Sequence, residues 1–236
     1  ATDDGGKRPG YRLTGWDDAA TGDPIALGAT IPTIAQNYSL NAVWTVSLYD
    51  VRYETGTLSL VDRMPANQTG NRYLAAMAVS SNIPYLSGYD FLYWTTTGID
   101  GSEMTFTPGS AFNMPDNDLT LTAVWEPRSS PVYYHANGAA GGTVESGRFF
   151  TDSVVTVSGN MFSRPGYRFL GWSERSATAG VSQQPGNSFT MPPRQVNFYA
   201  QWEKLSYTVT YIVSGGTGTM DGSTPYAVYT GLGYGE

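Results

Sequence analysis

Six tryptophans recur in three pairs, and this repetition constrains the fold more than any other feature of the chain. The pairs are Trp16–Trp44, Trp94–Trp125 and Trp172–Trp202. The first members of the pairs are evenly spaced along the chain, and each second member follows its first at a similar interval. A fixed period of this size is typical of tandem arrays of like modules. The sequence therefore predicts modules of about 78 residues rather than one larger domain.

The segments around the tryptophans share a common pattern. The first tryptophan of each pair follows a Gly-Tyr step, at 10–11, 88–89 and 166–167. Gly-Tyr steps of this kind, twice preceded by Pro, are typical of a turn that leads into a strand. Phe-x-Met-Pro follows at 112–115 and 189–192, and an alternating apolar run ends in the second tryptophan. These alternating runs predict strands that place their apolar residues on one face.

This pattern divides the chain into four segments. Residues 1–44 form the trailing half of a repeat, 45–125 and 126–202 form two full repeats, and 203–236 form the leading half of another. The connectors between repeats are very short, so neighbouring repeats should adopt a limited range of angles. We expect a chain that is mainly β, in an elongated array. A short helix at 71–79 is a minor alternative, which would make the modules small α+β units.

Composition excludes several functional classes. The chain has no cysteine, so disulfides and thiolate metal sites are excluded. Its net charge of −7 disfavours nucleic acid as a partner. No stretch approaches about 18 apolar residues, so membrane insertion through a helix is not expected. The 17 tyrosines, 9 phenylalanines and 6 tryptophans provide the large apolar surfaces that a module of this size needs for its core.

The assembled motifs resemble those of the Listeria–Bacteroides repeat, which is the B repeat of internalin-type bacterial surface proteins. The resemblance covers essentially the whole chain, although Tyr93 replaces the glycine that precedes the tryptophan elsewhere. It implies tandem β-grasp-like modules, similar to ubiquitin and SUMO, in extracellular proteins attached to the cell wall. It also implies a spacer role, with binding roles in some members, and brings no catalytic residues.

The residues by themselves offer few means of catalysis or metal binding. His135 is the only histidine, so a catalytic triad or histidine-rich metal site would have to use it, and we favour the interpretation of an edge or surface strand residue. The acidic runs Asp17-Asp18 and Asp116-Asn117-Asp118 lack the spacing of a calcium loop and are typical of solvated turns. An isopeptide bond from Lys204 has no repeating counterpart. We therefore expect no enzyme activity, no cofactor and no metal site.

Two acceptor patterns for N-glycosylation, at Asn37 and Asn67, match frequently by chance. The tyrosines offer a more specific hypothesis. Tyr49, Tyr93, Tyr133 and Tyr199 are expected on the strand faces opposite the core, where they could contact a glycan or a host-surface protein.

Three functions remain open at this point. The first is a stalk or spacer at the cell surface or cell wall, whose contacts are the neighbouring repeats of the same chain. The second is an adhesive module that uses the exposed tyrosines or a sheet edge. The third is a self-assembling fibre, because the chain begins with a trailing half repeat and ends with a leading half, which could complement one another between chains.

Overall fold

The computed structural model describes residues 6–30, 39–98, 100–176, 178–212 and 226–233, and these contain strands but no helix. The alternative of a helix at 71–79 is wrong. This segment contains the end of strand β5 (Gln68–Arg72), a turn, and strand β6 (Ala76–Ala78). Leu74 adopts a φ of 60°, and a residue in that region cannot continue a right-handed helix.

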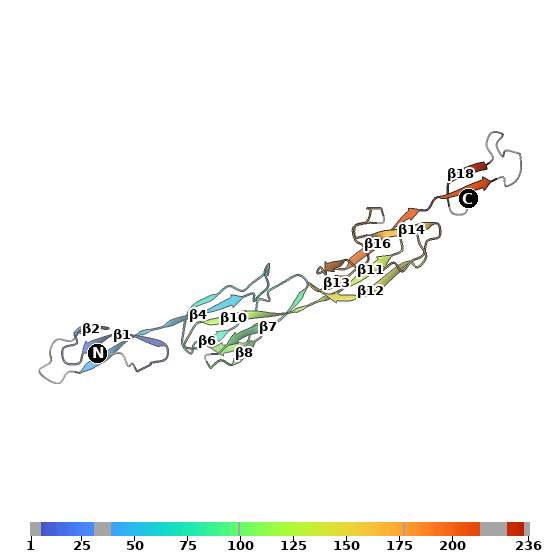
Figure 1. The fold of residues 1–236 in the computed structure, drawn as a ribbon. Coiled ribbons are helices and arrows are strands. Elements are labelled where there is room, and N and C mark those ends of the chain that lie inside the picture. The colour runs from blue at the N-terminus through green and yellow to red at the C-terminus, as the bar shows by residue number, and fades with distance from the viewer. Residues whose placement is uncertain (1–5, 31–38, 99, 177, 213–225, 234–236) are drawn as a thin grey trace. The chain divides into compact units, whose positions relative to one another are not determined.

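The chain divides into two compact units (Figure 1). The first consists of Ala1–Leu86 and Asp90–Glu126, and the second of Ser87–Tyr89 and Pro127–Glu236. Strand β7 therefore starts with a residue of the second unit and continues in the first.

The described residues of the first unit form three sheets. A three-stranded sheet has the order β2-β1-β3, a five-stranded sheet the order β5-β4-β10-β7-β8, and β6 pairs with β9 alone. We call β4–β10 module A. The strands are β1 Tyr11–Asp18, β2 Pro24–Ala26, β3 Leu40–Val46, β4 Leu48–Glu54, β5 Gln68–Arg72, β6 Ala76–Ala78, β7 Tyr89–Thr97, β8 Glu103–Phe106, β9 Ala111–Asn113 and β10 Leu119–Pro127.

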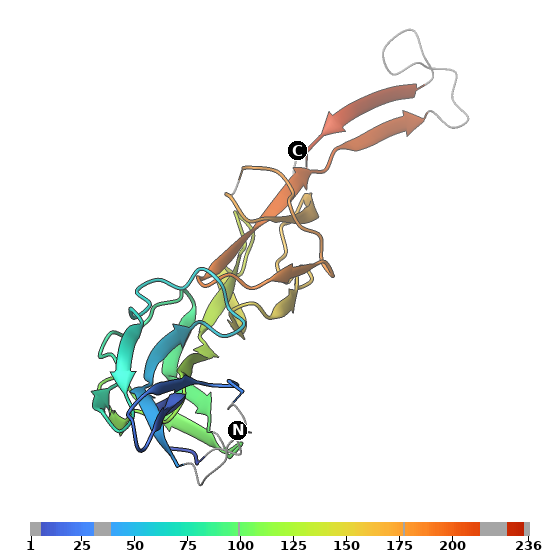
Figure 2. The same ribbon diagram turned by 90° about the vertical axis from the view of Figure 1, so that its left-hand side faces the viewer.

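The second unit repeats this plan. Module B, β11–β16, has a four-stranded sheet in the order β12-β11-β16-β14 and a separate pair, β13-β15. Beyond module B, β17 and β18 form an antiparallel two-stranded ribbon, seen at the red end of the chain in Figure 2. The strands are β11 Ser129–His135, β12 Thr143–Phe150, β13 Val154–Thr156, β14 Tyr167–Ser173, β15 Ser188–Thr190, β16 Val196–Lys204, β17 Tyr207–Ile212 and β18 Tyr226–Leu232.

In both modules the opening strand lies parallel to the closing strand. Leu119 pairs with Val51 in module A, and Val196 pairs with Val132 in module B. Parallel neighbours cannot be joined by a tight hairpin, so the rest of the module forms the crossover. The small pairs β6-β9 and β13-β15 belong to this crossover and supply residues that close the core.

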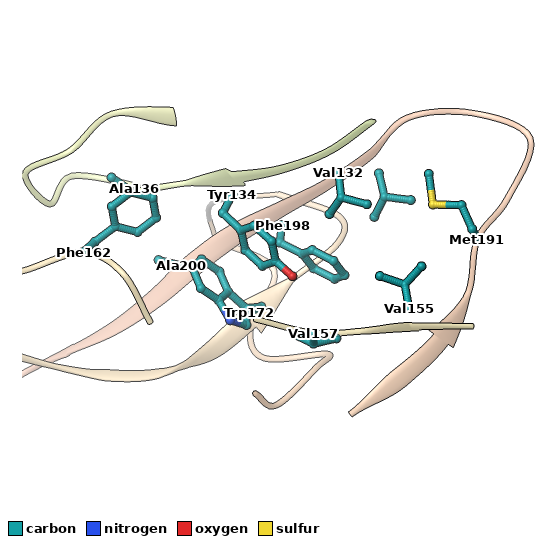
Figure 3. Close-up of a cluster of buried hydrophobic side chains, with 11 residues drawn as sticks. Val132, Tyr134, Ala136, Val155, Val157, Phe162, Trp172, Met191, Phe198 and Ala200 are labelled. Carbon is teal, nitrogen blue, oxygen red and sulfur yellow. The ribbon is translucent and has the colours of Figure 1, made fainter. Parts of the chain in front are cut away.

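The core of module B shows why the tryptophan period recurs. Trp172 is fully buried, and Tyr134 meets it edge-on at 4.6 Å between ring centroids. Phe198 stacks on Tyr134, and Met191 of the Met-Pro motif closes the far end of the cluster (Figure 3). Module A places Trp94, Tyr53 and Met114 in the same way. Alternation therefore predicted the inward faces of the closing strands correctly, including Leu121 and Phe198, which are both fully buried.

The β-grasp fold implied by the family resemblance is not confirmed. A β-grasp module packs a helix across its sheet, whereas in the described parts of modules A and B this place is taken by the pairs β6-β9 and β13-β15. The fold is thus all β in the described residues.

Candidate functional site

The outward face of β11 and β16 gathers polar aromatic side chains in module B. Val132 and Tyr134 point into the core, so the alternate residues Tyr133 and His135 face outward. The parallel register places His135 opposite Tyr199 and Tyr133 opposite Asn197. We call these four residues the aromatic face: Tyr133, His135, Asn197 and Tyr199.

The geometry of this face is well defined. The rings of His135 and Tyr199 stack at 4.5 Å with 13° between their planes. His135 Nε2 lies 3.0 Å from the Asn197 side-chain oxygen, and its Nδ1 lies 2.9 Å from the Thr143 hydroxyl. Because an amide oxygen only accepts, Nε2 carries the proton in this arrangement. Hydrogen bonds at both nitrogens hold the imidazole in place, which explains His135 as a structural surface residue.

Tyr133 is also held by a neighbour. Its hydroxyl bonds to the Glu145 carboxylate of β12, and this hydrogen bond is the main cause of a raised pKa for the phenol. Tyr133 and Tyr199 are both only half-buried, so each leaves part of its ring open to solvent. Half-exposed, immobilised rings are suited to stacking against an apolar face of a ligand.

The four tyrosines that we expected on the strand faces opposite the core have different surroundings in the structure. Tyr133 and Tyr199 lie on the same face of the neighbouring strands β11 and β16. The expectation for Tyr49 is wrong, because Tyr49 shares a strand face with Val51 and Tyr53 and packs against the core of module A. The alternation of these three residues in the sequence would have shown this. Tyr93 is half-buried on β7, next to the buried Trp94.

A second surface feature was not anticipated. Module A has an open hollow of about 580 Å³ over β7, β8 and β10. It is lined by Thr95, Thr96, Thr97, Glu103, Asp118, Thr120 and Thr122. The Thr95 hydroxyl donates to Glu103, and Asp118 forms an ion pair with Arg52 at 3.0 Å. Both carboxylates thus have partners, and the repeated threonines are the feature of the sequence that marks this hollow.

The acidic runs have structural partners. Asp116 accepts hydrogen bonds from the Tyr49 hydroxyl and from the Gly10 amide, and Asp18 accepts from the Ala20 amide at 2.7 Å. Across the described residues, no group of three or more His, Asp or Glu side chains is arranged to hold a metal ion.

Two other features of the sequence, the acceptor patterns for N-glycosylation and the apolar stretches, can be compared with the structure. The side-chain oxygen of Asn67 accepts from the Tyr53 amide at 3.1 Å, whereas Asn37 lies outside the described residues. In the part of the chain that the structure describes, no helix is long and apolar enough to span a membrane.

Comparison with known proteins adds a family. The family model described as "Divergent InlB B-repeat domain" matches residues 85–129 and 134–206. Two proteins of Evansella cellulosilytica are similar along most of the chain. One, named "Putative membrane protein", is 25% identical over 228 residues, which is 94% of this chain and 32% of the relative. The other, named "Putative Gly-rich membrane protein", is 24% identical over 233 residues, 93% of this chain and 25% of the relative.

The chain thus spans a third or less of the length of these two relatives. Among solved structures, domains 3–4 of the Streptococcal High Identity Repeats in Tandem from a cell surface protein show 14% identity and a TM-score of 0.23. This match covers 66% of the present chain and 98% of the other.

Proposed function

The chain belongs to the divergent InlB B-repeat domain family, and from this membership we propose that it is a non-enzymatic, extracellular repeat region of a bacterial cell-surface protein. In this function the repeats, at 45–125 and 126–202, act as a stalk that spaces another part of the protein from the cell surface or wall. Its routine contacts are the neighbouring repeats of the same chain.

One observation carries the spacer proposal. The closing strand of each module runs almost directly into the opening strand of the next. Ser47 alone separates β3 from β4, and Arg128 alone separates β10 from β11. A long flexible linker would leave many backbone torsions free between modules, whereas a one-residue connector leaves few. Short connectors between repeated modules suit a spacer, because each added module then adds length.

The spacer proposal can be tested by changing the number of modules. A carrier that displays the chain on a bacterial surface with an epitope at its outer end would receive one, two or three added copies of module B. Each copy should raise the epitope by up to about 30 Å, since a nine-residue strand spans about that length. Super-resolution localisation of the epitope measures this height.

The matched control replaces the added modules with flexible Gly/Ser segments of equal length. Their end-to-end distance grows only with the square root of residue number, so the epitope should rise less. A height that does not depend on module number, or that is equal for modules and flexible segments, would contradict the spacer function.

The aromatic face favours a second function, an adhesive module for a glycan or a host-surface protein. Tyr133 and Tyr199 present half-exposed rings on the same face of two neighbouring strands, where Asn197 and His135 lie opposite them. A glycan array probed with the intact chain and with the variants Tyr133→Ala and Tyr199→Ala tests this function. Binding that both variants abolish would support it. If the chain binds no glycan and no component of a host-surface extract, the adhesive function is contradicted.

A further inference from the structure

Three glycines recur once in each repeat period, and each makes the same hydrogen bond to a connector. They are Gly10, Gly88 and Gly166, the glycines of the Gly-Tyr steps. Their carbonyl oxygens accept from the amides of Ser47 at 2.9 Å, Arg128 at 2.8 Å and Leu205 at 2.8 Å. Each of these donors is the first residue after a closing strand. The Gly-Tyr turn therefore holds the connector that leads into the following module.

The connector Arg128 is held from the other side as well. Its carbonyl accepts from the Thr151 amide at 2.9 Å and from the Thr151 hydroxyl at 3.1 Å. The turn Ser87–Tyr89, the connector and Thr151 all belong to the second compact unit. Both polar groups of the Arg128 backbone are thus bonded, which removes most of the rotational freedom of a one-residue connector.

Gly10 and Gly88 are also in close contact with the following module. A Cβ on Gly10 would lie 2.7 Å from the Cβ of Tyr73, within the first unit. A Cβ on Gly88 would lie 2.5 Å from the Pro193 Cβ and 2.7 Å from the Thr151 hydroxyl, within the second unit. Separations below 3.0 Å are not tolerated without movement of the backbone or of these short side chains. Glycine is therefore required at positions 10 and 88 by the neighbouring module.

The surfaces that receive the two glycines are equivalent. Tyr73 and Thr151 are separated by one repeat period, and each precedes a non-glycine residue with positive φ. These residues are Leu74, with φ of 60°, and Asp152, with φ of 64°. This strained corner follows β5 in module A and β12 in module B. Because this corner occurs at the equivalent position in both modules, it is a regular feature of the module and not a property of one loop.

A tyrosine and a carboxylate also take part in the contact in both units, but they come from different positions of the repeat. In the first unit Asp116 accepts from the Gly10 amide at 2.7 Å and from the Tyr49 hydroxyl at 2.5 Å. In the second unit the Tyr89 hydroxyl donates to Asp152 at 2.7 Å. The backbone part of the contact is thus shared, and the side-chain part is specific to each pair of modules.

We propose that the corner of each module is a docking surface for the Gly-Tyr turn of the module that precedes it, and that the two form a joint restricting rotation about the connector. The partner that this surface fits is another module of the same family with glycine at the turn. The joint deepens the spacer function and rests on it for its biological use.

Amide hydrogen exchange in the intact chain tests the joint. Gly88→Ala places a methyl group against Pro193 and Thr151, so the Arg128 amide should exchange faster, by on the order of tenfold. Gly109→Ala is the matched control, because Gly109 has φ of 80° against 83° for Gly88 and nothing lies within 4 Å of its Cβ position. It carries the same backbone strain without the contact and should leave the Arg128 amide unchanged.

The first unit provides an independent repeat of this experiment. Gly10→Ala should speed exchange of the Ser47 amide and leave that of Arg128 unchanged. Gly22→Ala is its control, with φ of 77° against 79° and open space around the Cβ position. Equal exchange in the variant and its control, in either unit, would overturn the joint.

A milder variant covers the case in which Gly88→Ala does not fold. Tyr89→Phe removes only the hydroxyl that donates to Asp152 and should speed exchange of the Arg128 amide about three- to tenfold. No change at Arg128 in Tyr89→Phe would equally overturn the joint. These measurements use purified protein, so they can fail while epitope height still follows module number, and the reverse also holds. Failure of the joint and failure of the spacer function are thus distinguishable.

Discussion

At the residue scale, each full module is organised around one tyrosine and one tryptophan. Tyr53 meets Trp94 edge-on at 5.0 Å, as Tyr134 meets Trp172. The phenol oxygens accept backbone amides at the same distance of 2.8 Å, from Ser80 and Ser158. The two sites differ in the indole N–H. Trp172 donates to the Ser158 carbonyl at 3.0 Å, whereas the buried Nε1 of Trp94 has no partner among the described residues.

This difference predicts unequal effects of the same substitution. Trp172→Phe removes the donor of the Ser158 carbonyl, whereas Trp94→Phe removes a donor without such a bond. Both lose similar apolar contact, so Trp172→Phe should lower the free energy of unfolding by about 1 kcal/mol more than Trp94→Phe does. Denaturant unfolding monitored by fluorescence of the remaining tryptophans measures both. Equal losses would show that the indole hydrogen bond contributes nothing.

Asp116 predicts an acid-sensitive contact in the first unit. The hydrogen bond from Tyr49, followed by that from the Gly10 amide, lowers the pKa of Asp116 below its ordinary 3.8. A carboxyl with a lowered folded-state pKa stabilises the fold above its ordinary pKa, and this contribution is lost as the pH falls through the lowered value. The stability difference between the wild type and Asp116→Ala should therefore be constant above about pH 5 and shrink below pH 3.8.

Unfolding midpoints of the first unit at a series of pH values measure this difference. Tyr49→Phe removes the larger of the two causes and provides the matched comparison, since it should weaken the same acid dependence without removing the carboxylate. Profiles of wild type and Asp116→Ala that stay parallel down to about pH 2 would contradict the prediction.

At the scale of elements, the strand after the Gly-Tyr turn carries an irregularity in its pairing with the closing strand. The register shifts between Leu13 and Gly15 in β1, and between Phe169 and Gly171 in β14. A bulge of this kind lets Phe169 and Trp172 both face the core, although strict alternation would place them on opposite faces. Gly171 has φ of 142°, and a Cβ there would lie 2.6 Å from Val181.

Gly171→Ala should therefore destabilise module B by about 1–3 kcal/mol, because the residue is both strained and sterically blocked. Gly186→Ala, with φ of 87° and nothing within 4 Å, is the control for strain without a clash and should cost less. Thermal unfolding followed by far-UV circular dichroism compares the two. A smaller loss for Gly171→Ala than for Gly186→Ala would mean that the bulge relaxes around the added methyl group.

At the scale of the whole molecule, modules A and B have separate cores. The buried cluster around Trp94 contains only residues of module A, and the cluster around Trp172 only residues of module B. Separate cores of this kind can unfold independently, as expected for arrays in which each module contacts only its neighbours.

Trp172→Ala should accordingly lower the stability of module B by about 3–5 kcal/mol. Module A should change by less than about 0.5 kcal/mol, because distant and independent sites add. Hydrogen exchange of the amides of Val51 and Leu121, on the paired strands β4 and β10, reports module A, and that of Val132 and Phe198 reports module B. Equal loss of protection in both modules would mean that the two cores unfold as one.

Much of this architecture could be predicted from the sequence because it is local. The regular tryptophan period, the Gly-Tyr turns and the alternation that buries Leu121 and Phe198 depend on nearest neighbours along the chain. Tyr49 was misplaced although its alternation with Val51 and Tyr53 was readable, and the segment 71–79 was open to a helix because its alanines favour one.

Contacts between distant residues were decided only by the tertiary structure. The stack of His135 on Tyr199 needs the parallel pairing of β11 with β16, which are far apart in the sequence. The hydrogen bond from the Gly10 amide to Asp116 likewise joins residues that are far apart in the sequence of the first unit. It gives Gly10 a role in addition to forming a turn. Repetition and side-chain period are written along the chain, so the sequence by itself determined the modular, mainly β character of this protein. Sheet order and the contacts of the Gly-Tyr turns within each unit depend on which residues meet in space, so only the folded structure decided them.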